Sequence, residues 1–131
     1  MLRVIDASFG LVLVGFAGAA GWGCGSPKPG EKCDTSGFFC ADSRSALECR
    51  NGSWVSLPCK GTGGCARDTD VIRCDMSGNV VGDLCATSAE AKGLCAPDGL
   101  SVLECRDGKI EKTSSCSSCE VVGDQISCTP P

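Results

Sequence analysis

The fold is decided by a six-residue block that occurs twice, as Leu47-Glu48-Cys49-Arg50-Asn51-Gly52 and as Leu103-Glu104-Cys105-Arg106-Asp107-Gly108. In each copy an Asn-Gly or Asp-Gly pair follows residues that alternate between two faces of an extended chain. This pattern predicts a β-hairpin with a type I′ turn, because both central residues of that turn adopt positive φ. The first hairpin then pairs Arg50 with Ser53 and Cys49 with Trp54.

Alternation along the two hairpins predicts which face of each is buried. The inner face is expected to carry Leu47, Cys49 and Trp54 in the first copy and Leu103, Cys105 and Ile110 in the second. The outer face is expected to carry Glu48, Arg50 and Val55 in the first copy and Glu104, Arg106, Lys109 and Glu111 in the second. Both outer faces should therefore meet solvent.

Thirteen cysteines extend the repeat over most of the chain. Cys24 stands apart, and the other twelve form two ordered sets, Cys33, Cys40, Cys49, Cys59, Cys65 and Cys74, then Cys85, Cys95, Cys105, Cys116, Cys119 and Cys128. Twelve cysteines in the roughly 107 residues after Cys24 exceed the ~8–10% that marks a disulfide scaffold. The sequence predicts a small disulfide-rich, mainly β fold with two tandem hairpin-based modules, residues 33–78 and 79–131. Disulfides worth about 3 kcal/mol each compensate for the small core of a module this size.

Each module is expected to close with a second, shorter hairpin. A turn at Gly123-Asp124 places Cys119 opposite Cys128, close enough for a cross-strand disulfide, and the equivalent bond is Cys65–Cys74. Six cysteines still allow 15 connectivities, among which sequence alone does not choose. One helical turn is expected within residues 87–93, with Ser88 as its cap, and residues 76–79 are expected to form a turn between the modules.

The N-terminus is typical of an exported protein. Residues 1–23 are interpreted as a signal peptide, since an apolar run from Ala7 to Ala20 follows Arg3 and is too short to span a membrane. Gly21-Trp22-Gly23-Cys24 resembles a bacterial lipobox, in which the cysteine takes the lipid. The small, polar, proline-rich residues that follow predict a flexible tether over residues 24–32. Ordinary cleavage after Ala19 is the competing prediction.

The number of cysteines left to form disulfides favours lipidation of Cys24. If that thiol carries a lipid, twelve cysteines remain to pair, whereas cleavage after Ala19 leaves one thiol unpaired. A lipid on Cys24 anchors a protein to a membrane without a spanning segment. We therefore expect a lipid-anchored protein of the bacterial cell envelope, at the outer membrane or surface rather than the inner membrane. Simple secretion is the alternative.

Composition argues against several classes of function. The chain carries a net charge of −4 and no basic stripe, so we expect no nucleic-acid partner. It has no histidine, which removes the commonest general base and metal ligand, and we expect no enzyme activity, cofactor or metal. Cys116-Ser117-Ser118-Cys119 has the spacing of a redox pair, but without a βαβ context structural disulfides are favoured.

Two features are candidate ligand contacts. Trp54, Phe38 and Phe39 are suited to stacking on a sugar, although the second module has Ile110 in place of Trp54, which favours a role in the core. The loop that begins at Lys60 and runs through residues 61–64 is a candidate protease-inhibitory loop. An extracellular protein or a glycan is the expected partner besides the membrane.

The motif Leu-x-Cys-x-Asn-Gly-x-Trp, here residues 47–54, followed by Cys59, resembles that of bacterial cysteine-rich cell-surface lipoproteins. The resemblance covers both repeats and implies location rather than activity. The six cysteines and the Cys-x-Asn-Gly hairpin are also similar to peritrophin-type chitin-binding domains. This chain differs from them in its short gap between Cys33 and Cys40 and in the missing aromatic residues of its second repeat. We expect a non-enzymatic surface lipoprotein with binding or structural modules, with a polysaccharide- or chitin-binding module or a secreted protease inhibitor as alternatives.

Overall fold

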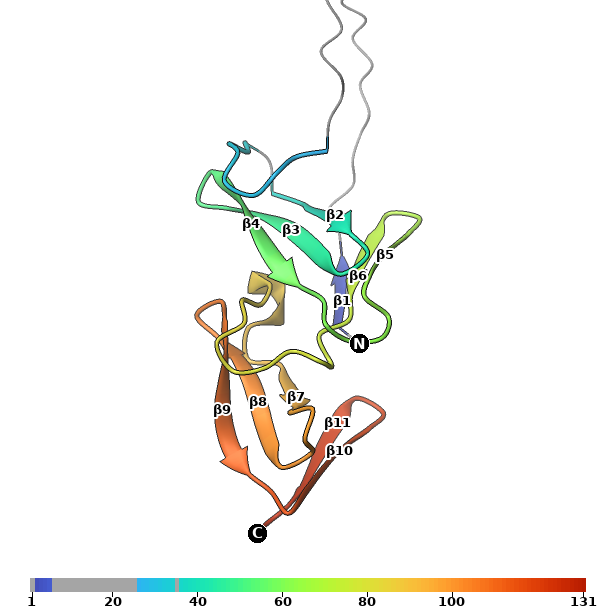
Figure 1. Ribbon diagram of the computed structural model, residues 1–131, viewed down its shortest axis with the longest axis vertical. Coiled ribbons are helices and arrows are strands. Elements are labelled where there is room, and N and C mark those ends of the chain that lie inside the picture. Colours follow the sequence, from blue (N-terminus) through green and yellow to red (C-terminus); the bar gives the residue numbers. More distant parts are fainter. Residues whose placement is uncertain (1, 6–25, 35) are drawn as a thin grey trace, which may run out of the picture.

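The computed structural model describes residues 2–5, 26–34 and 36–131 (Figure 1). The first half of the described chain forms β1 (Leu2–Ile5), β2 (Phe38–Asp42), β3 (Ser45–Arg50), β4 (Ser53–Pro58), β5 (Cys65–Asp68) and β6 (Val71–Cys74). The second half forms the 3-10 turn η1 (Thr87–Ala89), then β7 (Gly93–Cys95), β8 (Ser101–Arg106), β9 (Lys109–Ser115), β10 (Ser118–Val122) and β11 (Gln125–Thr129). The predicted small disulfide-rich, mainly β fold is confirmed.

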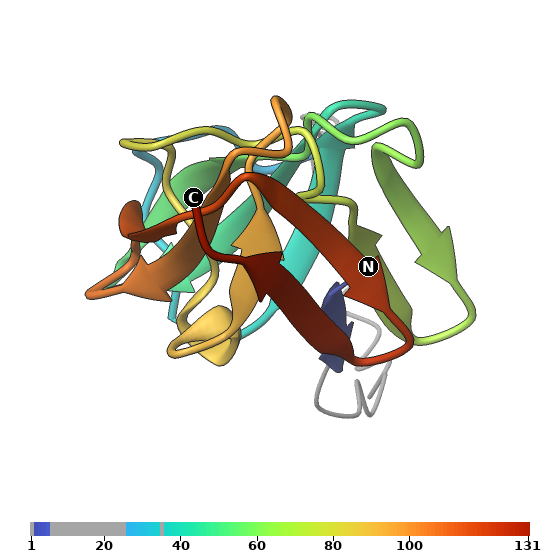
Figure 2. The same cartoon turned by 90° about the horizontal axis from the view of Figure 1, so that it is seen from below.

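The two modules are built alike. Each has a three-stranded antiparallel sheet, of order β2-β3-β4 in module one and β7-β8-β9 in module two, followed by a hairpin, β5-β6 or β10-β11. In module one the hairpin gains a third strand, because β1 pairs with β6. Viewed along the long axis, both hairpins lie on the same side of the three-stranded sheets (Figure 2).

The turns of the repeated block have the predicted geometry. Asn51 and Gly52 adopt φ of 51° and 80°, and Asp107 and Gly108 adopt 49° and 76°. Arg50 therefore faces Ser53, Cys49 faces Trp54, and Cys105 faces Ile110, in the predicted register. The turn after β10 is also confirmed, with Gly123 at φ 62° and Cys119 facing Cys128.

The six disulfides follow one connectivity in both modules. The first cysteine bonds the third, the second the fifth, and the fourth the sixth, giving Cys33–Cys49, Cys40–Cys65, Cys59–Cys74, Cys85–Cys105, Cys95–Cys119 and Cys116–Cys128. The repeat therefore extends from sequence to covalent structure.

The predicted bonds Cys65–Cys74 and Cys119–Cys128 are wrong, although both pairs do face each other across their hairpins. Facing cysteines lie on the same side of a hairpin, so both can instead reach other elements packed against that side. In module one Cys65 bonds Cys40 on β2, and Cys74 bonds Cys59 just after β4. A hairpin is already held by its backbone ladder, and the observed bonds tie it to the three-stranded sheet.

One continuous core joins the modules. Its buried side chains come from both halves, and include Ala46, Leu57, Ile72, Met76, Ala86, Ala89, Leu103 and Ile110. The predicted turn between the modules is present, since the Asn79 N–H donates to the Met76 carbonyl at 2.9 Å. Asn79 is fully buried, however, so the modules are packed together rather than linked by an exposed connector. The backbone needs a glycine here, because a Cβ on Gly78 would lie 2.5 Å from the Lys60 carbonyl oxygen.

Two expectations for local structure need correction. The predicted helical turn is present as η1, but Ser88 lies inside it and the residue before it is Ala86, which makes no side-chain cap. The predicted tether is partly ordered, because the Gly30 N–H donates to the Trp54 carbonyl and the Trp54 N–H donates to the Glu31 carbonyl. These bonds hold the last tether residues against the start of β4.

The predicted signal peptide and lipid site fall largely outside the described residues. Leu2–Ile5 form β1, whereas residues 6–23 and Cys24 are not described. Among the helices of the described residues, none is long and apolar enough to cross a membrane.

Candidate functional site: the module joint and a neighbouring groove

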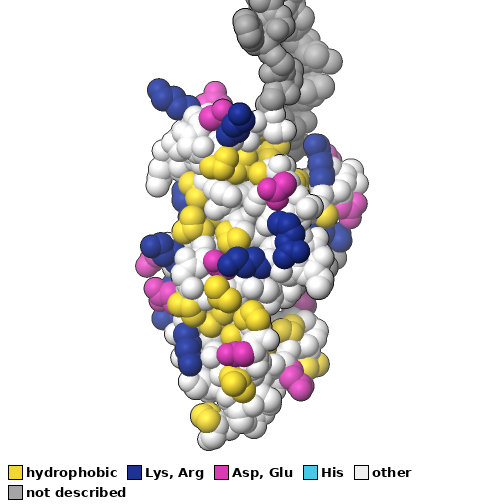
Figure 3. All heavy atoms as spheres, in the orientation of Figure 1, with side chains coloured by type: hydrophobic (Ala, Val, Ile, Leu, Met, Phe, Trp, Pro, Cys, Tyr) yellow, Lys and Arg dark blue, Asp and Glu magenta, His cyan; other side chains and the backbone are white. Residues whose placement is uncertain are grey.

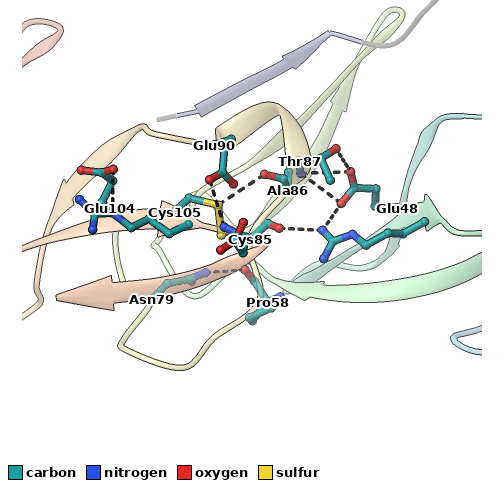
Figure 4. Close-up of a disulfide and its surroundings, with 12 residues drawn as sticks. Glu48, Pro58, Asn79, Cys85, Ala86, Thr87, Glu90, Glu104 and Cys105 are labelled. Atoms are coloured by element: carbon teal, nitrogen blue, oxygen red, sulfur yellow. Dashed lines mark hydrogen bonds and ion pairs between the residues drawn. A yellow bond between two sulfur atoms is a disulfide. The ribbon is translucent and has the colours of Figure 1, made fainter. Parts of the chain in front are cut away.

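The joint between the modules is centred on Glu48 of β3. Glu48 was expected on a solvent face, but it is only 3% exposed because module two covers that face. Its carboxylate accepts the Thr87 backbone N–H at 3.1 Å and also the Thr87 hydroxyl (Figure 4). It forms an ion pair with Arg50, whose Nη2 donates to the Cys85 carbonyl at 2.7 Å. Opposite charges buried together hold a specific geometry when further hydrogen bonds satisfy them, as Thr87 and Cys85 do here. Arg50 Nε is buried without a hydrogen-bond partner among the described residues.

Arg50 also fits against the second hairpin turn. A Cβ built on Gly108 would lie 2.7 Å from Arg50 Nη1, so the guanidinium occupies the space above this glycine. The two copies of the repeated block therefore meet at the joint, the first through its arginine and the second through its turn.

The equivalent residues of module two remain on the surface. Arg106 Nε donates to Glu104 Oε1 at 3.1 Å, with 53% and 26% of the two side chains exposed. This hydrogen bond, with the charge of Glu104, raises the pKa of Arg106 above its usual value. The outer face predicted for module two is thus confirmed, whereas that of module one is wrong at Glu48.

A second set of bonds ties the loop after β4 to the segment between β6 and η1, residues 75–86, which we call the linker. Asn79 Oδ1 accepts the Lys60 backbone N–H at 3.0 Å, and Asn79 Nδ2 donates to the Pro58 carbonyl at 2.9 Å. Lys60 Nζ lies 2.8 Å from Asp83 Oδ2. Lys60 therefore takes part in holding the modules together, which does not favour the role of a protease-inhibitory side chain.

Asp75 shapes the rest of that loop. Its carboxylate accepts the Gly63 N–H at 2.9 Å and the Ser77 N–H at 3.0 Å. Burial works to raise the pKa of Asp75, but the hydrogen bonds from Ser77 and Gly63 outweigh it, and the pKa lies below its usual value. The glycine-rich loop is thus folded around a carboxylate rather than presented in an extended form.

The three predicted aromatic contacts lie together in module one. Trp54 is 8% exposed, and Phe39 packs edge-on against it with ring centroids 5.2 Å apart. Phe38 is partly buried against the core. A sugar-stacking platform needs an open ring face. The burial of Trp54 favours the core role that the sequence comparison of the two repeats also favoured.

The exposed large apolar side chains of the described residues all lie in module two. A groove of about 380 Å³ is lined by Val80, Val81, Ala96, Pro97, Asp98, Ser101, Leu103 and Lys112. Val80 and Val81 are 44% and 57% exposed, and Figure 3 shows hydrophobic side chains gathered over this module. Exposed apolar surface that lies between one acidic and one basic side chain suits a protein or peptide partner. This groove was not predicted from the sequence. Its only clue there is the adjacent pair Val80-Val81, which lies in the linker and outside the repeated motifs.

The cysteines and carboxylates give no sign of redox or metal chemistry in the described chain. Cys116 and Cys119, which share the CxxC spacing, bond to Cys128 and Cys95 rather than to each other. Among residues 26–34 and 36–131, no group of three or more acidic or cysteine side chains is placed to hold a metal ion. The CxxC is therefore part of the disulfide framework, as expected.

Comparison of the chain with protein-family models, with curated proteins and with solved structures finds no match.

Proposed function

We propose that the chain is an exported, lipid-anchored, non-enzymatic surface protein of the bacterial envelope, with two disulfide-stapled modules that act as one rigid binding unit. The observation that carries the proposal is the complete use of the cysteines. Six disulfides consume all twelve from Cys33 to Cys128, so Cys24 alone is left in the sequence for another purpose. A disulfide framework of this density is typical of proteins outside the cytoplasm.

The ordered end of the tether supports a function close to the membrane. Gly30 is fixed to β4 through its bond to Trp54. Gly30 lies six positions after Cys24, and an extended chain spans at most ~3.6 Å per residue, so a lipid on Cys24 would hold module one within about 20 Å of the bilayer surface. The groove of module two is the surface offered to an extracellular protein partner.

The test is the intact mass of the protein purified from membranes of a bacterial host that processes lipoproteins, with and without reduction and alkylation. We expect a chain that begins at Cys24, is heavier by its acyl groups, and shows twelve thiols only after reduction. The Cys24→Ser variant should lose the added mass and leave the membrane fraction. An unlipidated wild-type chain that begins near Ala20 would overturn the lipid anchor, and free thiols in the purified protein would overturn the disulfide framework.

A further inference from the structure

The outer edge of β6 pairs with an extended segment of the same chain. In the full chain β6 lies between two strands, with β5 on one side and β1 on the other (Figure 1). The pairing with β1 is antiparallel and covers four positions, from Leu2 opposite Cys74 to Ile5 opposite Val71. The molecule therefore shows an extended segment seated on this edge.

The backbone groups that meet the seated strand can be identified from the other side of β6. The Asp75 N–H donates to the Gly64 carbonyl at 2.8 Å, and Asp68 faces Val71 across a two-residue turn. Because bonded and non-bonded pairs alternate along an antiparallel ladder, Val71 and Arg73 bond to β5. The N–H and C=O groups of Ile72 and Cys74 therefore point toward β1.

The next step rests on the proposed function. If export removes residues 1–23, it removes β1, and the polar groups of Ile72 and Cys74 lose their partners. Exposed edges are normally protected by proline, by charge or by a covering element. The equivalent strand β11 has Gln125 and Ser127 exposed and runs into Pro130-Pro131, whereas β6 has two buried apolar positions and no proline.

We propose that the β6 edge of the exported protein binds an extended segment of a partner protein by antiparallel strand addition. Main-chain hydrogen bonds supply the affinity in this mode, and alternate side chains supply the specificity. β1 also lies next to η1 of module two, so a segment in this seat borders both modules at their joint. An added strand would thus contact β6 of module one and η1 of module two at the same time.

Charge defines the residue that the partner should present. In the register of β1 and β6, position 3 faces Arg73. Opposite charges at facing positions stabilise a strand pair, whereas like charges destabilise it. Arg73 lies 3.0 Å from the Asp68 carboxylate on its other side. A carboxylate at the position opposite Arg73 would be attracted to its guanidinium. The expected ligand is an extended segment with β-branched apolar residues on either side of an acidic one.

The direct test titrates the isotope-labelled exported protein with the synthetic peptide Leu-Arg-Val-Ile-Asp-Ala, residues 2–7, and with its Arg3→Glu variant. We expect amide NMR shifts concentrated at Val71–Cys74 and Thr87–Ala89, and about fivefold tighter binding of the Arg3→Glu peptide. The Arg73→Ala protein should bind both peptides with equal affinity. Absence of shifts at Val71–Cys74 with both peptides would overturn the proposal.

Backbone methylation provides a matched control that leaves every side chain intact. N-methylation at Val4, which faces Ile72, should weaken binding at least tenfold, because it removes a hydrogen bond to β6. N-methylation at Arg3, whose N–H points away from β6, should change affinity less than twofold. Equal losses from both methylations would contradict strand addition.

The remaining outcomes separate this proposal from the function on which it rests. Peptide binding to an exported chain without a lipid supports the edge site and overturns only the anchor. Retention of residues 1–23 in the purified protein overturns the edge site, because β1 then stays in place. A dimer whose contacts map to Val71–Cys74 would assign the edge to a second copy and overturn the peptide partner.

Discussion

Glu48 and Glu104 occupy equivalent positions in the two modules, yet their environments differ. The Glu48 side chain is 5% exposed and accepts hydrogen bonds from module two, whereas the Glu104 side chain is 26% exposed and pairs only with its neighbour Arg106. The same Glu-Cys-Arg triplet thus builds a buried contact in one module and a surface pair in the other. Glu104 therefore serves as the internal control when the contribution of Glu48 to the free energy of unfolding is measured.

The first prediction compares Glu48→Gln with Glu104→Gln. Removing one charge from a buried pair leaves the other uncompensated, so Glu48→Gln should lower the free energy of unfolding by about 2–4 kcal/mol. Glu104→Gln should change it by less than ~0.5 kcal/mol, because solvent screens the surface pair. Guanidinium unfolding with the disulfides intact measures both values. Equal effects would show that Glu48 does not hold the modules together.

The second prediction concerns Trp54. Replacement by Ala removes most of a side chain that is 8% exposed and should destabilise module one by about 3–5 kcal/mol. Trp54→Phe keeps an aromatic ring against Phe39 and should cost about half as much. Thermal unfolding followed by circular dichroism distinguishes the two variants.

The same variants test the glycan alternative on a chitin column. We expect no retention of the wild-type protein, because the ring face of Trp54 is covered. Retention of the wild type that is lost in a folded Trp54→Ala variant would support glycan binding and contradict a purely structural role.

The third prediction is a pH dependence set by Asp75. Its pKa is lowered in the folded protein, so it contributes stability above the unfolded value of about 3.8, and that contribution is lost as pH falls through the lower folded pKa. Near pH 7, Asp75→Asn should cost about 1–2 kcal/mol, because the Gly63 and Ser77 N–H groups lose a charged acceptor. The difference between wild type and variant should shrink below pH 4. A difference that stays constant from pH 7 to pH 2 would contradict this account.

Local structure was predictable from the sequence where one residue pattern dominates. Asn51-Gly52 and Asp107-Gly108 favour a single turn type, and side-chain alternation fixes the register of the strands on either side. The face predictions for Leu103, Cys105 and Ile110 held for the same reason, since all three are buried. These features depend only on neighbours in the chain.

Features that depend on distant contacts were not predictable. Cys65 and Cys74 face each other as expected, but which sulfur each one meets depends on how the hairpin packs against β2 and the end of β4. The alternation of side chains along β3 places Glu48 on the outer face. It is buried only because Thr87 of module two packs against that face. The groove likewise arises from the fold of the linker, which no short motif in the sequence encodes.

The central claim is that both modules carry the same set of disulfides, which tie each hairpin to its sheet. A tryptic map of the unreduced, denatured protein tests it in module one, because cleavage after Lys60, Arg67 and Arg73 separates Cys59, Cys65 and Cys74. We predict that peptide 61–67, which holds Cys65, is linked to peptide 33–44, within which fragmentation assigns the bond to Cys40 rather than Cys33. Cys59 should be linked to Cys74, and fragmentation within the last tryptic peptide should join Cys116 to Cys128. A peptide that joins Cys65 to Cys74, or unpaired thiols among the twelve, would contradict the account.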